Sequence, residues 1–197
     1  MRLENIRIIF ISIGLIGILF FASPTIGLLV KPPADEEFSE LYILGPNYTL
    51  DYIPFNIKAD VTYLVYLGVG NDMGSSCYYT CFVKIGNETE LLPDAKLGVP
   101  SSLPALFEYK SFISDGGTLE APLTFRVNEL TFTNGTCKLS NMTINGIELS
   151  VNQTSAWNSD KGGYYYNLFV ELWIFNSTLG ISQYHNRFVD LFLNMTK

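Results

Sequence analysis

The sequence predicts an all-β domain, folded as an antiparallel sandwich, behind a single N-terminal membrane helix. Residues 8–30 form one apolar run without a charged residue. After it, apolar residues recur at every second position in several short runs, which is the period of a half-buried strand. Turn residues separate these runs, and no long amphipathic helix is indicated among them. We therefore expect a membrane helix within residues 1–30, a stalk at 31–37 and one domain at 38–197.

The apolar run is long enough to cross a bilayer, since its 23 residues would extend about 34 Å as a helix. Two arginines precede it and acidic residues follow it at 35–37, which favours a cytoplasmic N-terminus. A cleaved signal peptide with its apolar region at residues 8–22 is the alternative. A cut after Ala22 would leave bulky Phe20 three residues before it, and a cut after Ser23 would leave Pro24 just beyond it, whereas a cut after Gly27 is tolerable. We expect an uncleaved single-pass anchor in membrane lipid through residues 8–30, with the domain outside the cell.

The first half of the domain is predicted to contain three strands. Residues 38–44 form the first, and residues 61–69 and 77–85 alternate in the same way. Residues 70–74 are turn formers, so we expect the strands on either side to pair as an antiparallel hairpin. Residues 91–106 are rich in Pro and Gly and are expected to loop over the surface.

The second half shows the same alternation between turn signals. Strands are expected at 123–127, continued past a bulge over 130–133, and at 142–151, 164–175 and 188–195, with turns at 115–117, 158–163 and 176–180. Seven or more short strands in one domain favour an immunoglobulin-like β-sandwich in the loose sense. A closed barrel is the alternative architecture.

Composition narrows the class of protein. The chain is 48% hydrophobic and 14% aromatic, which excludes a disordered chain. Residues 32–197 carry 9 Lys and Arg against 18 Asp and Glu, a net charge of −9. Nucleic acid is therefore not an expected partner, because phosphate binding needs clustered Lys and Arg. The acidic balance also argues against electrostatic docking on anionic lipid.

The chain contains seven Asn-x-Ser/Thr triplets, the acceptor motif for N-linked glycans, and all of them follow the apolar run. About two would be expected by chance. They begin at Asn47, Asn87, Asn134, Asn141, Asn152, Asn176 and Asn194. Asn194 is the site we expect to be skipped if any is, because it lies close to the C-terminus. The distribution predicts an extracellular glycoprotein with about four or more occupied sites.

The three cysteines should tend to oxidise outside the cell. Cys77 and Cys81 stand four apart on a predicted strand, with Cα atoms about 13 Å apart, too far for a disulfide. We expect Cys137 to pair with Cys81 across the sheets, with Cys77–Cys137 as the alternative. One thiol is then left over, buried or linked to another chain. The spacing does not fit a zinc site.

Few residues could carry catalysis. His185 is the only histidine, and any Ser–His or Cys–His system would have to use it. Glu171 and Asp190 are the two carboxylates in mid-strand positions and could suggest a glycosidase pair. Exposure to solvent, or pairing with Arg126 or Arg187, is the favoured interpretation of both. We therefore predict no enzyme, no catalytic residue and no cofactor.

Metal binding is also weakly indicated. Four aspartates fall at predicted loops or strand ends and are the candidates for scattered Ca²⁺ ligands, although we predict no metal site. These are Asp60, Asp72, Asp115 and Asp160.

Core packing explains most of the aromatic residues, and a contact surface for a protein partner or self-assembly, or a carbohydrate-binding platform, is the expected role of the rest. Three consecutive tyrosines at 164–166 cannot all face one side of a strand. One face is then core and the other a partly exposed aromatic strip, of the kind enriched at interfaces. The predicted contact residues are Tyr164, Tyr166, Trp173 and Trp157.

Two pairs of segments carry a family resemblance. One is residues 38–47 (FSELYILGPN) with 51–54 (DYIP), and the other is residues 164–173 (YYYNLFVELW) with 184–194 (YHNRFVDLFLN). Together they resemble archaeal membrane proteins grouped as the domain-of-unknown-function family DUF1616. The resemblance implies an archaeal cell-surface setting and brings no catalytic residues. Several members of that family have several membrane helices before this domain, whereas this chain has one apolar segment.

These observations predict an anchored cell-surface protein with a structural or protein-binding role. It would be an envelope component, or an accessory subunit of a membrane or surface assembly. A viral envelope or filament glycoprotein is the alternative, and an extracellular hydrolase is the least favoured.

Overall fold

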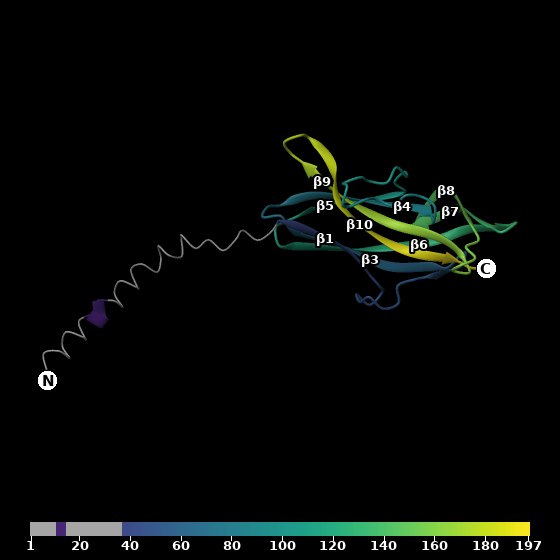
Figure 1. Cartoon of the computed structure of the whole chain (residues 1–197), viewed down its shortest axis with the longest axis horizontal. Helices are drawn as coiled ribbons and strands as arrows, with labels where there is room; N and C mark the ends of the chain where they lie inside the picture. Colours follow the sequence, from purple (N-terminus) through teal and green to yellow (C-terminus); the bar gives the residue numbers. More distant parts are fainter. Residues whose placement is uncertain (1–10, 15–36) are drawn as a thin grey trace. The chain divides into compact units, whose positions relative to one another are not determined.

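The computed structural model describes residues 11–14 and 37–197 (Figure 1). The chain divides into two units, Met1–Glu37 and Phe38–Lys197. In the first unit residues 11–14 are helical, and the rest of the predicted anchor and most of the predicted stalk lie outside the described residues. Within the residues that are described, no helix is long and apolar enough to cross a membrane.

The second unit is an all-β sandwich of two five-stranded sheets, which confirms the predicted class. The first sheet has the order β1-β3-β6-β7-β8 and the second the order β2-β10-β9-β4-β5. Neighbouring strands run antiparallel, except that two-residue β2 pairs in parallel with β10. The strands are β1 (Phe38–Leu44), β2 (Asn56–Ile57), β3 (Thr62–Asp72), β4 (Cys77–Asn87), β5 (Phe107–Ile113), β6 (Gly117–Thr133), β7 (Thr136–Ile144), β8 (Ile147–Ala156), β9 (Tyr164–Asn176) and β10 (Ile181–Met195).

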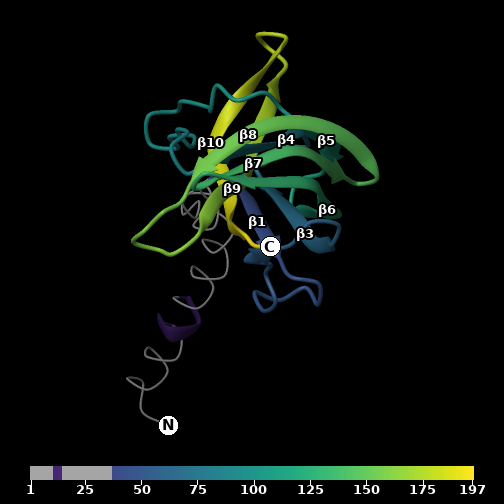
Figure 2. The ribbon, with the colours of Figure 1, turned by 90° about the vertical axis from the view of Figure 1, so that its right-hand side faces the viewer.

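The core lies between the two sheets, where alternate side chains of facing strands meet. Val65, Leu67 and Val69 of β3 are fully buried from one side, and Val83 of β4 and Val170 of β9 from the other. Period-two sequences produce this core because successive side chains of a strand point to opposite faces. At one end, the β9–β10 hairpin projects beyond the sheets, and Figure 2 shows it as the yellow tip.

The predicted hairpin between residues 61–69 and 77–85 is wrong. β3 and β4 belong to different sheets, because each already has two other hydrogen-bonded neighbours. The connection crosses between the layers instead of turning within one. The buried Asn71 side chain stabilises this crossing, since its Nδ2 donates to the carbonyls of Ser75 and Ile113 at 2.9 Å each.

The predicted strand at 142–151 is in fact two strands. β7 and β8 meet at Asn145 and Gly146, whose φ values of 47° and 81° are both positive. A two-residue Asn-Gly turn of this kind matches the twist of the strands that it joins. The predicted bulge near residue 128 is present, because the β6–β7 register shifts between Val127 and Leu130.

The segment between β4 and β5, predicted as a surface loop over 91–106, covers the outer face of the second sheet. Its Ser101 bonds to both Lys84 of β4 and Glu171 of β9, across neighbouring strands. A Cβ at Gly86 would stand 2.7 Å from Cδ1 of Leu103 in this loop, so a larger residue there would require the Leu103 side chain to move. We call residues 88–106 the covering loop.

The strand register defines two ends of the sandwich. β1 begins at Phe38 opposite Asp72, and Asn71 lies opposite Gly117, so these residues mark the Phe38 end. Asn87 lies opposite Tyr166 at the other end.

Candidate glycan acceptors and the cleft beside Asn87

All seven acceptor asparagines reach the solvent. Six of them lie at turns, at strand ends or on the edge strand β8, whereas Asn141 lies within β7 between β6 and β8, and none is buried. Asn47, Asn134 and Asn152 are exposed, and Asn87, Asn141, Asn176 and Asn194 are partly exposed. This geometry permits glycosylation, which stays a prediction.

Asn87 and Asn176 hold their side chains in the same way. Each Oδ1 accepts the backbone N–H two residues on, from Thr89 at 2.9 Å and from Thr178 at 3.0 Å. Each also accepts the N–H three residues on. At Asn87 the Thr89 hydroxyl donates to the same oxygen at 2.7 Å. Such side-chain turns occur where Asn begins a tight turn after a strand.

Beside Asn87 the surface is hollowed into a cleft of about 360 Å³ between the end of β4 and the β8–β9 connection. We call it the Asn87 cleft. Its lining combines one aromatic ring with hydroxyls, amides and a carboxylate. The lining residues are Asn87, Glu88, Thr89, Thr136, Thr154, Ser155, Ala156, Trp157 and Asn158.

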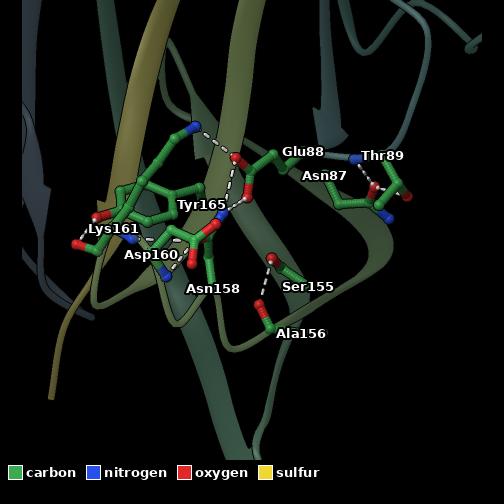
Figure 3. Close-up of polar contacts among 9 residues, drawn as sticks. All are labelled: Asn87, Glu88, Thr89, Ser155, Ala156, Asn158, Asp160, Lys161 and Tyr165. Atoms are coloured by element: carbon green, nitrogen blue, oxygen red, sulfur yellow. Dashed lines mark hydrogen bonds and ion pairs between the residues drawn. The ribbon is translucent and has the colours of Figure 1, made fainter.

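One wall of the cleft is held by Glu88, which ties β4 to the β8–β9 connection (Figure 3). Asn158 Nδ2 donates to both carboxylate oxygens, at 3.0 and 2.8 Å, and Lys161 forms an ion pair with Oε1. The hydrogen bonds from Lys161 and Asn158 hold the pKa of Glu88 below its ordinary value. The carboxylate is therefore ionised at neutral pH and keeps the wall in place.

The four predicted contact residues have different environments. Trp157 is 50% exposed and Tyr164 is partly buried, with their rings edge to face at 5.1 Å. Trp173 is partly buried, and its indole N–H donates to Glu171. Tyr166 cannot be a surface contact, and its prediction was wrong, because its ring points into the core and is fully buried.

The predicted Cys81–Cys137 disulfide is not formed, and neither is its alternative Cys77–Cys137, because all three thiols are free. The carbonyl of Cys137 accepts the Tyr166 hydroxyl, and Tyr166 pairs with Asn87. Cys81 lies six residues before Asn87 on β4, about 20 Å along the strand. Burial raises the pKa of the Cys81 thiol to about 12, so it is protonated and unreactive at neutral pH.

Glu171 is paired with neither predicted arginine. Its carboxylate forms a buried ion pair with Lys84 on the next strand, with Nζ and Oε2 3.0 Å apart. Asp190 lies exposed on β10. A carboxylate neutralised in this way, under the covering loop, is not placed to protonate or attack a sugar.

His185 lies within β10, beside a register shift, and is partly buried against the first strand. Its Nε2 is 3.0 Å from the hydroxyl oxygen of Ser39, which is 2.6 Å from the Tyr79 hydroxyl. Ser39 is only 1% exposed, so a substrate carbonyl cannot reach it. The contact between Ser39 and His185 joins β1 of one sheet to β10 of the other and has a structural role.

We expect this contact to make stability depend on pH. Burial, and then the charge of Arg187, lower the pKa of His185 from 6.5. In the pH window just below 6.5, the unfolded chain therefore binds more protons than the folded chain. The stability that neutral His185 contributes to the fold is present above pH 6.5 and is lost as the pH falls through this window. Urea midpoints measured between about pH 5 and about pH 8 should fall more steeply with acid in the wild type than in His185→Gln. Parallel curves would contradict the prediction.

The predicted calcium candidates do not form a cluster. Across residues 11–14 and 37–197, no group of three or more Asp, Glu, His or Cys side chains is arranged to hold a metal ion. Asp60 and Asp160 lie in separate turns, and Asp72 and Asp115 lie at the Phe38 end.

The fold thus defines a two-sheet β-sandwich domain. The chain matches no protein-family model, so the resemblance to the archaeal family stays a prediction. It matches no curated protein.

Distant structural similarity is found. One match is a β-glucosidase from Listeria innocua in complex with glucose, 8% identical with a TM-score of 0.38, covering 82% of this chain and 16% of that one. Another is the PapD-like domain 7 of human CEP192, 9% identical with a TM-score of 0.33, covering 85% and 89%. The chain spans about one sixth of the β-glucosidase, and both likenesses concern the fold alone.

Proposed function

We propose that this chain is an N-terminally anchored, N-glycosylated cell-surface protein whose sandwich has a structural or protein-binding role. One observation carries the proposal: all seven acceptor asparagines reach solvent on one folded domain. The domain also buries two asparagines, Asn71 and Asn167, and neither belongs to an acceptor triplet. The triplets therefore follow the accessible surface, as sites used for modification must.

Three of the seven acceptors fit an anchored chain by their position, whereas Asn176 lies at the Phe38 end. The domain begins at Phe38, soon after the apolar run, whereas Asn87, Asn134 and Asn194 lie at the opposite end of the sandwich. Glycans there would point away from the attachment point. We assign the sandwich to the immunoglobulin-like class in the loose sense, because nearly all its strand pairs are antiparallel.

Binding or structure is a better fit than catalysis. The serine beside the only histidine is buried, and Glu171 is neutralised by Lys84. We place the protein at an archaeal surface on the strength of the resemblance, as an envelope component or an accessory subunit.

The proposal is tested by purifying the chain from native membranes in mild detergent, with mass spectrometry of the intact protein and of its peptides. We expect an uncleaved N-terminus, about four or more glycosylated asparagines and a stoichiometric partner chain or self-assembly. A chain in the soluble fraction without any glycan would contradict the proposal.

A further inference from the structure

The partly exposed side chain of Asn87, at the end of β4 in the second sheet, is hydrogen-bonded to β8 of the first sheet. Its Oδ1 accepts from the backbone and hydroxyl of Thr89, and its Nδ2 donates to the carbonyl of Thr154 on β8 at 2.9 Å. An N-linked sugar replaces one of the two amide hydrogens and leaves the other for this bond. The direction in which a glycan leaves Asn87 is therefore restricted by the fold.

The Asn87 cleft offers an apolar platform. Trp157 lines the same cleft and is half exposed, and its ring rests edge-on against Tyr164. Its backbone N–H donates to Gly135 at 2.8 Å, which fixes the residue in the β8–β9 connection. A pyranose ring has one face of C–H groups, and laying that face on an indole removes apolar surface of both from water.

The rest of the lining has the polar groups that sugars need. Hydroxyls of Thr89, Thr136 and Thr154 lie around the cleft, and the ionised Glu88 carboxylate forms part of its wall. The hydroxyls of Thr89 and Thr136 already donate to Asn87 Oδ1 and to the carbonyl of Thr133, so their oxygens, like the Glu88 carboxylate, can accept from sugar hydroxyls. The Thr154 hydroxyl can donate to a sugar. The volume of about 360 Å³ lies within the range of sites for small ligands.

We propose that the Asn87 cleft binds the first sugars of the glycan attached to Asn87 itself, with a sugar ring stacked on Trp157. The inference rests on the proposed function in one respect, that Asn87 is glycosylated. The carbohydrate then becomes part of the folded domain and bridges the end of β4 to the β8–β9 connection. Asn176 makes the same turn bonds at the Phe38 end, far from Trp157, and serves as the matched comparison.

The test is a double-mutant cycle on the full-length chain, made once in a eukaryotic host that N-glycosylates and once in a bacterial host that does not. The variants are Asn87→Gln, Trp157→Ala and their combination, with melting temperatures from circular dichroism. In the glycosylated chain, Asn87→Gln should lower Tm by about 3 °C more when Trp157 is present than when it is absent. In the unglycosylated chain the two changes should add.

Controls separate the glycan from the side chains. Asn176→Gln should add to Trp157→Ala in both hosts, and peptide mass spectrometry reports occupancy at each asparagine. If Trp157→Ala does not fold, Trp157→Leu takes its place. Equal coupling in both hosts, or simple additivity in the glycosylated chain, would overturn the inference. If Asn87 carries no glycan while other acceptor sites do, the inference is overturned and the proposed function stands. If none of the seven sites carries a glycan, both the inference and the proposed function are overturned.

Discussion

Replacing Lys84 by Met should lower the free energy of unfolding by about 3–5 kcal/mol. Lys84 and Glu171 are both buried under the covering loop, and Nζ of Lys84 also donates to the carbonyl of Ser101 at 2.8 Å. The variant leaves the Glu171 carboxylate in the same place without its counter-charge. The remaining donors to it, the Ser101 N–H and the Trp173 indole, are too few to replace a cation.

The measurement is urea unfolding followed by circular dichroism. The double variant Lys84→Met/Glu171→Leu should recover most of the loss, because it removes both charges and fills the site with apolar groups. Lys110→Met is the matched control, because Lys110 and its partner Glu108 are both half exposed. Such surface ion pairs contribute only about 0–1 kcal/mol to the free energy of unfolding. A loss at Lys84 no larger than at Lys110 would show that the pair is not buried in solution.

This ion pair illustrates what the sequence could not predict. Lys84 and Glu171 each interrupt an apolar run, so each can be recognised as a polar position on the outer face of its strand. Their pairing depends on β4 lying beside β9, and their burial depends on the covering loop. The pairing and the burial both depend on residues far apart in the sequence, and the alternation of residues within one strand gives no information about them.

The strands themselves were largely predictable, because a two-sheet sandwich buries alternate residues and the period is visible in the sequence. β1 occupies the predicted residues, and β9 extends one residue beyond its prediction. The pairing failed at the turn predicted over 70–74, because β3 continues to Asp72 and residues 73–76 cross between the sheets instead of forming a hairpin. The strand β5 was not predicted, because its exposed positions at the edge of the sheet include charged side chains.

Of the candidate sites, the acceptor asparagines could be recognised from the sequence because the motif is local. The Asn87 cleft could not, because Trp157 and Asn87 are brought together only by the packing of the β8–β9 connection on the end of β4. The disulfide prediction failed for a related reason: Cys77 and Cys81 stood on a predicted strand, but Cys137 fell between the strands predicted at 130–133 and 142–151, and the alignment of the two sheets was not known.

Replacing Tyr166 by Ala should be similarly damaging, with a loss of about 3–5 kcal/mol in the free energy of unfolding from the cavity alone. The ring is fully buried between the sheets. Its hydroxyl donates to the carbonyl of Cys137 on β7 at 2.5 Å and accepts the N–H of Ser155 on β8 at 3.1 Å. One side chain of the second sheet thus holds two strands of the first, and its removal leaves two buried backbone groups without their partner.

Tyr166→Phe separates the two contributions, because it keeps the ring and removes only the hydroxyl. We expect a loss of about 1–3 kcal/mol for that change, from the orphaned Cys137 carbonyl and Ser155 N–H. Chemical denaturation of the two variants and of Tyr164→Ala, whose ring is partly exposed and whose hydroxyl has no hydrogen-bond partner within residues 37–197, gives the comparison. Because Ser155 and Trp157 stand two residues apart, Tyr166→Phe should also loosen the wall of the Asn87 cleft. A Tyr166→Ala variant as stable as Tyr164→Ala would mean that the sheets are not joined at this end as the structure has them, and the cleft would lose its support with them.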